Sequence, residues 1–387
     1  MFKKFIKKII CFSLILSMSF TLISPLCVKA EEGTLGKTSP INVDSDSRIT
    51  KNITERIPKS ATQFVHQNYK EIIDVVMLHI DQFNVESSNL IDLKLGNPYV
   101  IYDLDIDKQD EIYFYPVLKD HTVVLVISIM GTTNGWNLSA NEDMVSKLNK
   151  ISYDKMDYIF YESNGNIVAE NSEVFSVLSG QENQLCHNFK SFDFNHKIEL
   201  ISSRIKEFVK TDTSIKIDPN IKHLEKATLT LYNQQGQGSY GMCWAASVAT
   251  IINYLKRTNI TAMNVCDREG VGYDEGGDIS LKQKALLDYG IYYDYVLYRQ
   301  ASWSEITKNI DNGKPLAASS HYSSERFHAV TIYGYQMFST NDYITIWNSG
   351  LNSGAGGSQI IYYNPLGSTF DYGNATYTLF RSLCYEI

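Results

Sequence analysis

The chain has 387 residues, enough for two domains after removal of a leader, and its formal net charge at pH 7 is −8. Five of its 35 basic residues and none of its 43 acidic residues lie within positions 1–30, so the rest of the chain is more acidic still. This charge argues against nucleic acid and against an anionic membrane as partners.

The first thirty residues are typical of a secretory signal peptide. A lysine-rich start is followed by an apolar stretch from Ile9 to Leu22, and Val28-Lys29-Ala30 places small residues where a signal peptidase reads them. We expect cleavage after Ala30, secretion of the remainder and no membrane association after that. A membrane anchor is the alternative, but the apolar run is shorter than the ~20 residues of a spanning helix, and Pro25 interrupts its end.

The next part of the chain predicts a linker and then a small α+β domain. Residues 31–60 are polar and lack apolar periodicity, which indicates a flexible linker. Residues 61–210 are expected to form the domain, with a helical pattern over 61–84. Residues 211–228, polar and containing Pro219, are expected to be an exposed linker where processing occurs. Strand patterns of the domain lie at residues 98–102, 111–118, 122–130 and 158–161.

Residues 229–387 predict a second α+β domain, with helices first and an antiparallel sheet after them. Cys243 to Lys256 indicates a helix that is apolar nearly all round and therefore lies at the centre of the domain. Further helices are expected at residues 280–289 and after the capping box Ser302-Trp303-Ser304-Glu305. Strands are expected at residues 316–319, 328–333, 343–347, 359–363 and 377–383.

The cysteines do not predict a disulfide scaffold or a metal site. Of six Cys, Cys11 and Cys27 leave with the leader, and the others are too few and too scattered for a scaffold. Cys266 and Cys384 are left open as a disulfide pair or as two free buried thiols. The chain has no Cys-x-x-Cys or His-Glu-x-x-His motif, so we expect neither a metal nor another cofactor.

Cys243 stands at the start of the central helix, directly after a glycine-rich turn. The partial positive charge at a helix N-terminus favours a thiolate there. A nucleophilic thiolate needs a base, and His328 opens an alternating strand that would hold its ring rigidly at the edge of the sheet. His321 lies in a polar run and is the weaker candidate.

Two amide side chains complete the candidate catalytic set. Asn348 ends the neighbouring strand, and its side-chain carbonyl is expected to accept from the second ring nitrogen of His328 and fix the tautomer. Gln237 lies in the turn before Cys243, where its amide is expected to donate to the negative oxygen of a tetrahedral intermediate.

These residues resemble the papain-like cysteine peptidases. That family has Cys-Gly-Ser/Ala-Cys-Trp/Tyr around its nucleophile, and this chain has Gln237-Gly238-Ser239-Tyr240-Gly241-Met242-Cys243-Trp244. The resemblance implies that Gln237, Cys243, His328 and Asn348 are oxyanion donor, nucleophile, base and orienting group. It also implies an α+β fold with a helical half and an antiparallel β half-barrel.

The layout is similar to that of the bacterial staphopains and streptopain, in which a long propeptide with a half-barrel of strands covers the active-site cleft. The segment from Leu95 to Asp103 looks similar to that propeptide. The similarity implies that residues 61–210 are an inhibitory propeptide.

The chain departs from the papain pattern at three positions. Tyr240 replaces a disulfide-forming Cys, and Met242 replaces a small residue beside the thiol. Gly350 stands where papain has the Trp that shields the Asn–His bond, and Trp347 is a candidate substitute for that shield.

The sequence therefore predicts a secreted bacterial cysteine endopeptidase, made as a zymogen that its own propeptide inhibits in cis. We expect the enzyme to be a monomer that acts on proteins or peptides. A cell-wall amidase or endopeptidase with a Cys-His site is one alternative. A non-catalytic secreted binding module on a protease-like fold is the other.

Overall fold

The computed structural model describes residues 57–78, 80, 83, 92–103, 112–132, 135–151, 158–163, 166–170, 175–179, 223–322, 326–373 and 375–385. The predicted signal peptide, most of the linker 31–60 and residues 211–222 of the processing linker lie outside the described residues. Internal contacts divide the chain into Met1–Asn42 and Val43–Ile387, and every described residue belongs to the second unit.

The N-terminal part begins with the long helix that the sequence predicted and continues as strands. All side chains from Val123 to Met130 are buried, which explains the nearly continuous apolar run at this point of the sequence. The elements are α3 (Lys59–Leu78), β1 (Lys94–Leu95), β2 (Ile101–Asp103), β3 (Ile112–Lys119), β4 (Thr122–Thr132), β5 (Gly135–Asn141), α4 (Val145–Lys150), β6 (Ile159–Ser163), β7 (Asn166–Glu170) and β8 (Phe175–Ser179).

The C-terminal part has helices first and strands after them, which confirms the predicted order. Residues 223–228, which the sequence assigned to the processing linker, form a strand because they pair with the long strand β12. The elements are β9 (His223–Thr228), α7 (Cys243–Lys256), α8 (Ala262–Glu269), α9 (Ile279–Asp288), β10 (Tyr295–Leu297), α10 (Trp303–Asp311), β11 (Leu316–His321), β12 (Phe327–Phe338), β13 (Asp342–Asn348), α11 (Leu351–Gly354), β14 (Gly357–Tyr362), β15 (Thr369–Tyr372) and β16 (Ala375–Cys384).

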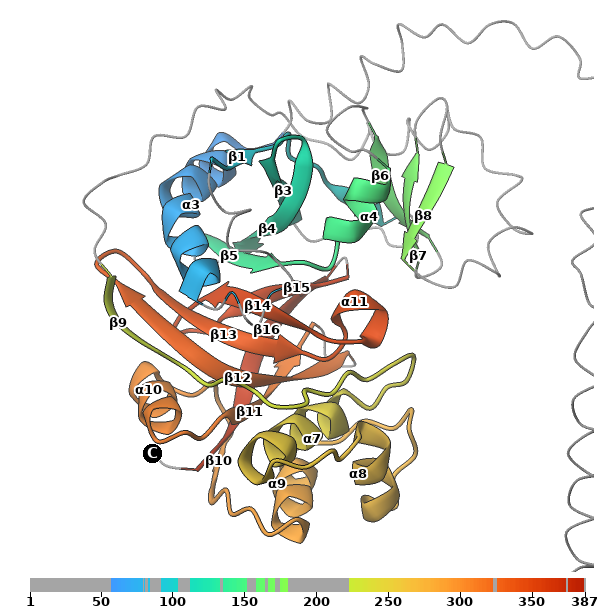
Figure 1. Cartoon of the computed structure of the whole chain (residues 1–387), viewed down its shortest axis with the longest axis vertical. Helices are drawn as coiled ribbons and strands as arrows, with labels where there is room; N and C mark the ends of the chain where they lie inside the picture. Colours follow the sequence, from blue (N-terminus) through green and yellow to red (C-terminus); the bar gives the residue numbers. More distant parts are fainter. Residues whose placement is uncertain are drawn as a thin grey trace, which may run out of the picture. The chain divides into compact units, whose positions relative to one another are not determined.

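One antiparallel sheet joins the two parts that the sequence assigned to separate domains (Figure 1). Its strands run in the order β1-β3-β4-β5-β14-β13-β12-β11-β16-β10, with β15 beside β16 and β9 beside β12. The junction is the pair β5–β14, where Asn141 faces Gln359 and Ala140 faces Ile360. A separate four-stranded sheet has the order β2-β6-β7-β8. The N-terminal strands thus extend the C-terminal sheet directly.

A buried carboxylate also joins α3 to the turn between β12 and β13. Glu71 is 1 % exposed and accepts hydrogen bonds from Asn341 Nδ2 (3.0 Å), Tyr343 OH (2.8 Å) and Thr340 Oγ1. Burial raises the pKa of Glu71, and the hydrogen bonds from Asn341 and Tyr343 oppose that rise. Since a buried carboxylate is costly without its donors, this cluster favours α3 in contact with the C-terminal part.

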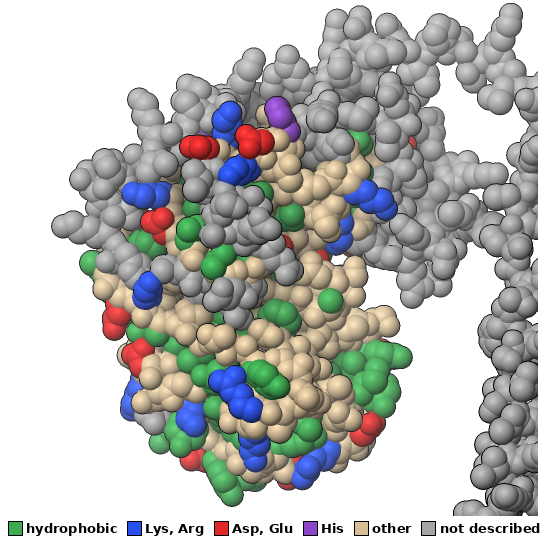
Figure 2. Space-filling model, viewed as in Figure 1, with side chains coloured by type: hydrophobic (Ala, Val, Ile, Leu, Met, Phe, Trp, Pro, Cys, Tyr) green, Lys and Arg blue, Asp and Glu red, His purple; other side chains and the backbone are tan. Residues whose placement is uncertain are grey.

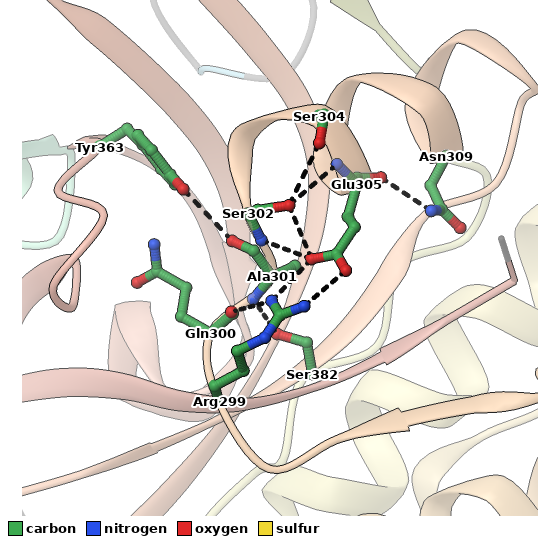
Figure 3. Close-up of polar contacts among 9 residues, drawn as sticks. All are labelled: Arg299, Gln300, Ala301, Ser302, Ser304, Glu305, Asn309, Tyr363 and Ser382. Carbon is green, nitrogen blue, oxygen red and sulfur yellow. Dashed lines mark hydrogen bonds and ion pairs between the residues drawn. The ribbon is translucent and has the colours of Figure 1, made fainter. Parts of the chain in front are cut away.

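The capping box predicted at the start of α10 is present (Figure 3). Ser302 Oγ accepts from the backbone N–H of Glu305, and the Glu305 carboxylate accepts from Ser302 N (2.7 Å). Arg299 adds a bidentate contact to the same carboxylate at 2.6 and 2.7 Å. The hydrogen bond from Arg299 lowers the pKa of Glu305 to about 2. These contacts fix the first turn of α10.

Charged side chains are spread over the described part of the face that Figure 2 draws. On the face drawn in Figure 2, lysines and arginines alternate with acidic and apolar side chains. Within the described residues, none of the helices has the length and apolar character needed to cross a membrane.

We expect Ser302→Ala to lower the free energy of unfolding by about 1 kcal/mol, because it removes the cap acceptor of α10. Ser304→Ala, at an exposed position two residues later, is the matched control and should change stability by less than about 0.5 kcal/mol. Chemical denaturation of the full-length chain measures both. Equal losses in the two variants would contradict the capping role.

Candidate active site

Cys243 is the first residue of α7, as the sequence predicted. Trp244, the next residue, is fully buried, and its indole N–H donates to Glu275 O (3.0 Å). Its ring lies so close to Gly277 that a Cβ there would be 2.4 Å from it. The contacts of Trp244 with Glu275 and Gly277 therefore anchor the first turn of α7 immediately after Cys243.

Hydrogen bonds join α7, which starts at Cys243, to β12, which carries His328. Ser247, one helical turn after Cys243, donates from Oγ to Val330 O (3.0 Å) and contacts Thr331 Oγ1 (2.8 Å). The backbone amide of Ala329, the residue after His328, is among the groups that lower the pKa of Cys243. Among the described residues, no hydrogen bond joins the Cys243 thiol directly to the His328 ring.

The His328 ring is 4 % exposed and lies 2.7 Å from Asn348, measured from Nε2 to Oδ1. Neighbouring strands supply the two residues, since Val330 of β12 is paired with Asn348 of β13. The backbone N–H of Gly350 also donates to Asn348 Oδ1 (3.1 Å). Because an oxygen that accepts from a backbone N–H is the amide carbonyl, His328 Nε2 must be the donor to it. His328 Nδ1 is then the nitrogen left to act as a base.

Tyr372 lies over the His328 imidazole, and the sequence did not predict it. Its ring stacks on His328 with centroids 4.5 Å apart and planes at 22°. A Cβ at Gly350 would lie 2.4 Å from the Tyr372 hydroxyl, so glycine is required for this ring to fit. Trp347, the substitute shield suggested by the sequence, donates its indole N–H to Gln235 O instead (2.9 Å). Tyr372 comes from β15, and no spacing in the sequence relates it to Asn348.

Gln237 lies beside the end of β13. Its backbone N–H donates to Ser349 O (3.1 Å), and its side-chain Oε1 accepts from Ser349 Oγ (3.1 Å). Its Nε2 donates to Tyr240 O (3.2 Å) and to Tyr372 OH (3.5 Å). The expected oxyanion donor is thus near the Asn348 side of the site, with its amide hydrogens engaged by protein groups.

The environment favours a neutral thiol and a neutral imidazole. Burial raises the pKa of Cys243, although Lys282 and nearby backbone amides lower it. Burial lowers the pKa of His328 to about 4, although the hydrogen bond to Asn348 raises it. The described structure therefore does not favour the thiolate–imidazolium pair that the sequence predicted for the working enzyme.

Lys282, a residue of α9, lies completely buried near this pair. Its Nζ donates to Ser319 Oγ (2.6 Å) and Ala318 O (3.2 Å), and burial lowers its pKa to about 8. Coulombic attraction to its charge favours the Cys243 thiolate. No sequence pattern indicates a role for Lys282, since a lysine on a short helix is usually exposed.

Other residues weighed in the sequence take no part in the site. His321 packs edge-on against Phe380 with centroids 4.9 Å apart. Cys266 and Cys384 are free and buried, so the disulfide alternative is not observed. The part of the chain that the structure describes contains no group of His, Cys, Asp and Glu arranged to hold a metal.

Residues 226–370 match the model of a family described as the Peptidase_C39 like family, and this span contains all four candidate residues. No curated protein is similar enough in sequence to match the chain. The match supports a cysteine peptidase in the C-terminal part of the chain, while the similarity to staphopains and streptopain stays a prediction.

Two solved structures show weak likeness. One comes from a study of antibody cross-reactivity between the mite allergens Blo t 1 and Der p 1, with 16% identity, 39% of this chain covered, 67% of the other, and a TM-score of 0.27. The other is digestive procathepsin L 3 of the Tenebrio molitor larval midgut, with 14% identity, coverages of 40% and 69%, and a TM-score of 0.27. TM-scores this low add no weight to the assignment.

We expect His328 to make the folded chain sensitive to acid. Because its pKa of about 4 lies below the ordinary 6.5, the unfolded chain binds more protons between these values. The free energy of unfolding should therefore fall as the pH drops through this window, by on the order of 3 kcal/mol from this residue. Denaturation at several pH values should give a smaller loss for His328→Leu. His321→Leu is the control and should lose as much unfolding free energy on acidification as the wild type, because His328 is intact. An equally large loss in His328→Leu would contradict the assignment.

Proposed function

We propose that the chain is the precursor of a secreted cysteine endopeptidase that hydrolyses peptide bonds in proteins. The observation that carries the proposal is the buried His328–Asn348 hydrogen bond on the strands against which α7, the helix that starts at Cys243, packs. The backbone amide of Ala329, the residue that follows His328 in β12, is among the groups that lower the pKa of Cys243. In the proposal, Cys243 is the nucleophile, His328 the base and Asn348 the orienting group, which is the set of groups that acyl transfer requires.

In the proposed reaction, Cys243 gives its proton to Nδ1 of His328 and its sulfur attacks the scissile carbonyl carbon. Gln237 Nε2 and the backbone N–H of Cys243 stabilise the negative oxygen. His328 then passes the proton to the leaving amine, and an acyl-enzyme remains. Water gives a proton to His328, attacks the thioester and releases the acid, while the proton returns to the sulfur.

The full-length chain is proposed to be latent. Two features support this: burial raises the pKa of Cys243 and lowers that of His328, which favours their neutral forms, and the Gln237 amide donates to Tyr240 and Tyr372. The N-terminal part also contacts α11, which follows Asn348 closely in the chain, since Asp143 Oδ1 accepts from the backbone N–H of Asn352 (2.5 Å). Residues 61–210 are thus proposed to act as an inhibitory propeptide of a monomeric enzyme.

Cys243→Ala should reduce casein hydrolysis by more than about 10³-fold, because it removes the nucleophile. It should also abolish labelling by an epoxide-type thiol-protease inhibitor, read by mass spectrometry of the modified peptide. Cys266→Ala, which removes another free thiol, is the control and should keep both properties.

Casein hydrolysis that survives in Cys243→Ala, or labelling at another residue, would contradict the proposal. Zymography on casein and on peptidoglycan separates the endopeptidase from the cell-wall amidase. Activity on peptidoglycan alone would favour the amidase, and no activity on either would favour the binding module.

If contact with the N-terminal part keeps the site latent, Glu71→Ala should speed inhibitor labelling of Cys243 in the full-length chain by about tenfold or more. The variant removes the acceptor of three hydrogen bonds between α3 and the β12–β13 turn, which weakens the contact by about 1–3 kcal/mol. Gln67→Ala, at an exposed position on α3, is the matched control and should label at the wild-type rate. No acceleration in Glu71→Ala would count against inhibition by this domain.

A further inference from the structure

The hydrogen-bond chain that begins at His328 continues beyond Asn348. Asn348 Nδ2 donates to Gln359 Oε1 (3.1 Å). Gln359 Nε2 in turn lies within hydrogen-bonding distance of Asp371 O (3.0 Å), Asp371 Oδ1 (3.0 Å) and Ser139 Oγ (2.6 Å). Asn348 and Gln359 are both 0 % exposed, so water does not compete for these contacts.

The direction of each amide in this chain is fixed by a backbone group. Gly350 N–H can only donate, so the atom of Asn348 that faces it is the oxygen. Asp371 O can only accept, so the atom of Gln359 that faces it is the nitrogen. With both ends fixed, Gln359 Oε1 faces Asn348 Nδ2, and Asn348 Oδ1 faces His328 Nε2.

This series of hydrogen bonds ends at residues of the N-terminal part. Asp371, 6 % exposed, accepts from Ser128 Oγ of β4 and from Asn141 Nδ2 of β5 (3.2 Å). Ser139 of β5 contacts Gln359 directly. Burial raises the pKa of Asp371, and the hydrogen-bond donors around it oppose that rise, with the largest effect from Ser128. In the full-length chain, residues on both sides of the β5–β14 junction thus hold Gln359 in one orientation. After removal of residues 61–210, Asp371 of β15 is the partner of Gln359 Nε2 that would remain in the processed enzyme.

We propose that Gln359 is a positioning residue for the catalytic histidine: it orients Asn348, and Asn348 in turn holds the proton of neutral His328 on Nε2. Nδ1 of His328 then keeps its lone pair for the Cys243 proton. Gln359 touches neither substrate nor thiol. The inference rests on the proposed peptidase function, which it extends by one residue.

Gln359→Met tests this role, since it keeps the length of the side chain and removes the acceptor for Asn348. We expect kcat of the processed enzyme to fall by about 10- to 100-fold with KM little changed, because the imidazole is misplaced and not the substrate. Gln336→Met is the matched control, a buried glutamine of β12 that contacts β9 and β13 away from His328. It should keep the wild-type kcat.

Gln359→Glu separates positioning from packing. A protonated glutamic acid still accepts from Asn348 and donates to Asp371, whereas an ionised one places two carboxylates side by side. The activity of Gln359→Glu, expressed as a ratio to that of the wild type at the same pH, should therefore be near one at acidic pH and fall as the pH rises. A glutamine that only fills space would give a ratio that does not change with pH.

The histidine tautomer gives a readout that does not require activity. In ¹⁵N-histidine-labelled full-length protein, NMR should show neutral His328 with its proton on Nε2, and Gln359→Met should give a mixture of tautomers if it folds. A proton on Nδ1 in the wild type, or unchanged kcat and tautomer in a folded Gln359→Met, would overturn the proposal. If the wild type shows the expected tautomer but cleaves no protein, the peptidase function fails while the positioning role stands.

Discussion

The packing of α7 on β12 is the constraint on which the site depends. Ser247 hydrogen-bonds to Val330 and Thr331, and this contact sets the start of the helix against the start of the strand. Cys243 lies one helical turn before Ser247 in α7, and His328 lies shortly before Val330 in β12. Because α7 is buried nearly all round, the helix has little freedom to shift without opening the core.

Around that contact the protein holds its reactive groups uncharged. The thiol and the imidazole are both in surroundings where burial outweighs the groups that favour their ionised forms. Tyr372 stacks on the imidazole and its hydroxyl accepts from the Gln237 amide, so one side chain touches both the proposed base and the proposed oxyanion donor. Its strand, β15, also carries Asp371, which is bonded to the N-terminal strands. Removal of the N-terminal part would therefore alter the surroundings of both groups.

The features that the sequence predicted correctly are those that depend on local sequence patterns. The start and end of the central helix, the capping box of α10 and the nearness of His328 to Asn348 follow from periodicity, cap chemistry and motif spacing. Tyr372, Gln359 and Lys282 could not be predicted in this way. They reach the site from β15, β14 and α9 through tertiary packing, and each looks in sequence like an ordinary strand or surface residue. The β5–β14 junction was missed for the same reason, since strand patterns do not say which edges pair.

The central claim is that the full-length chain brings Cys243 and His328 together while keeping both neutral. Thiolate absorbance of the full-length protein, taken as the difference from Cys243→Ala and followed from about pH 5 to about pH 10, tests it most directly. The account predicts that the signal of Cys243 rises only above the ordinary thiol pKa of 9.0. A thiolate already present at acidic pH in the unprocessed chain would contradict it.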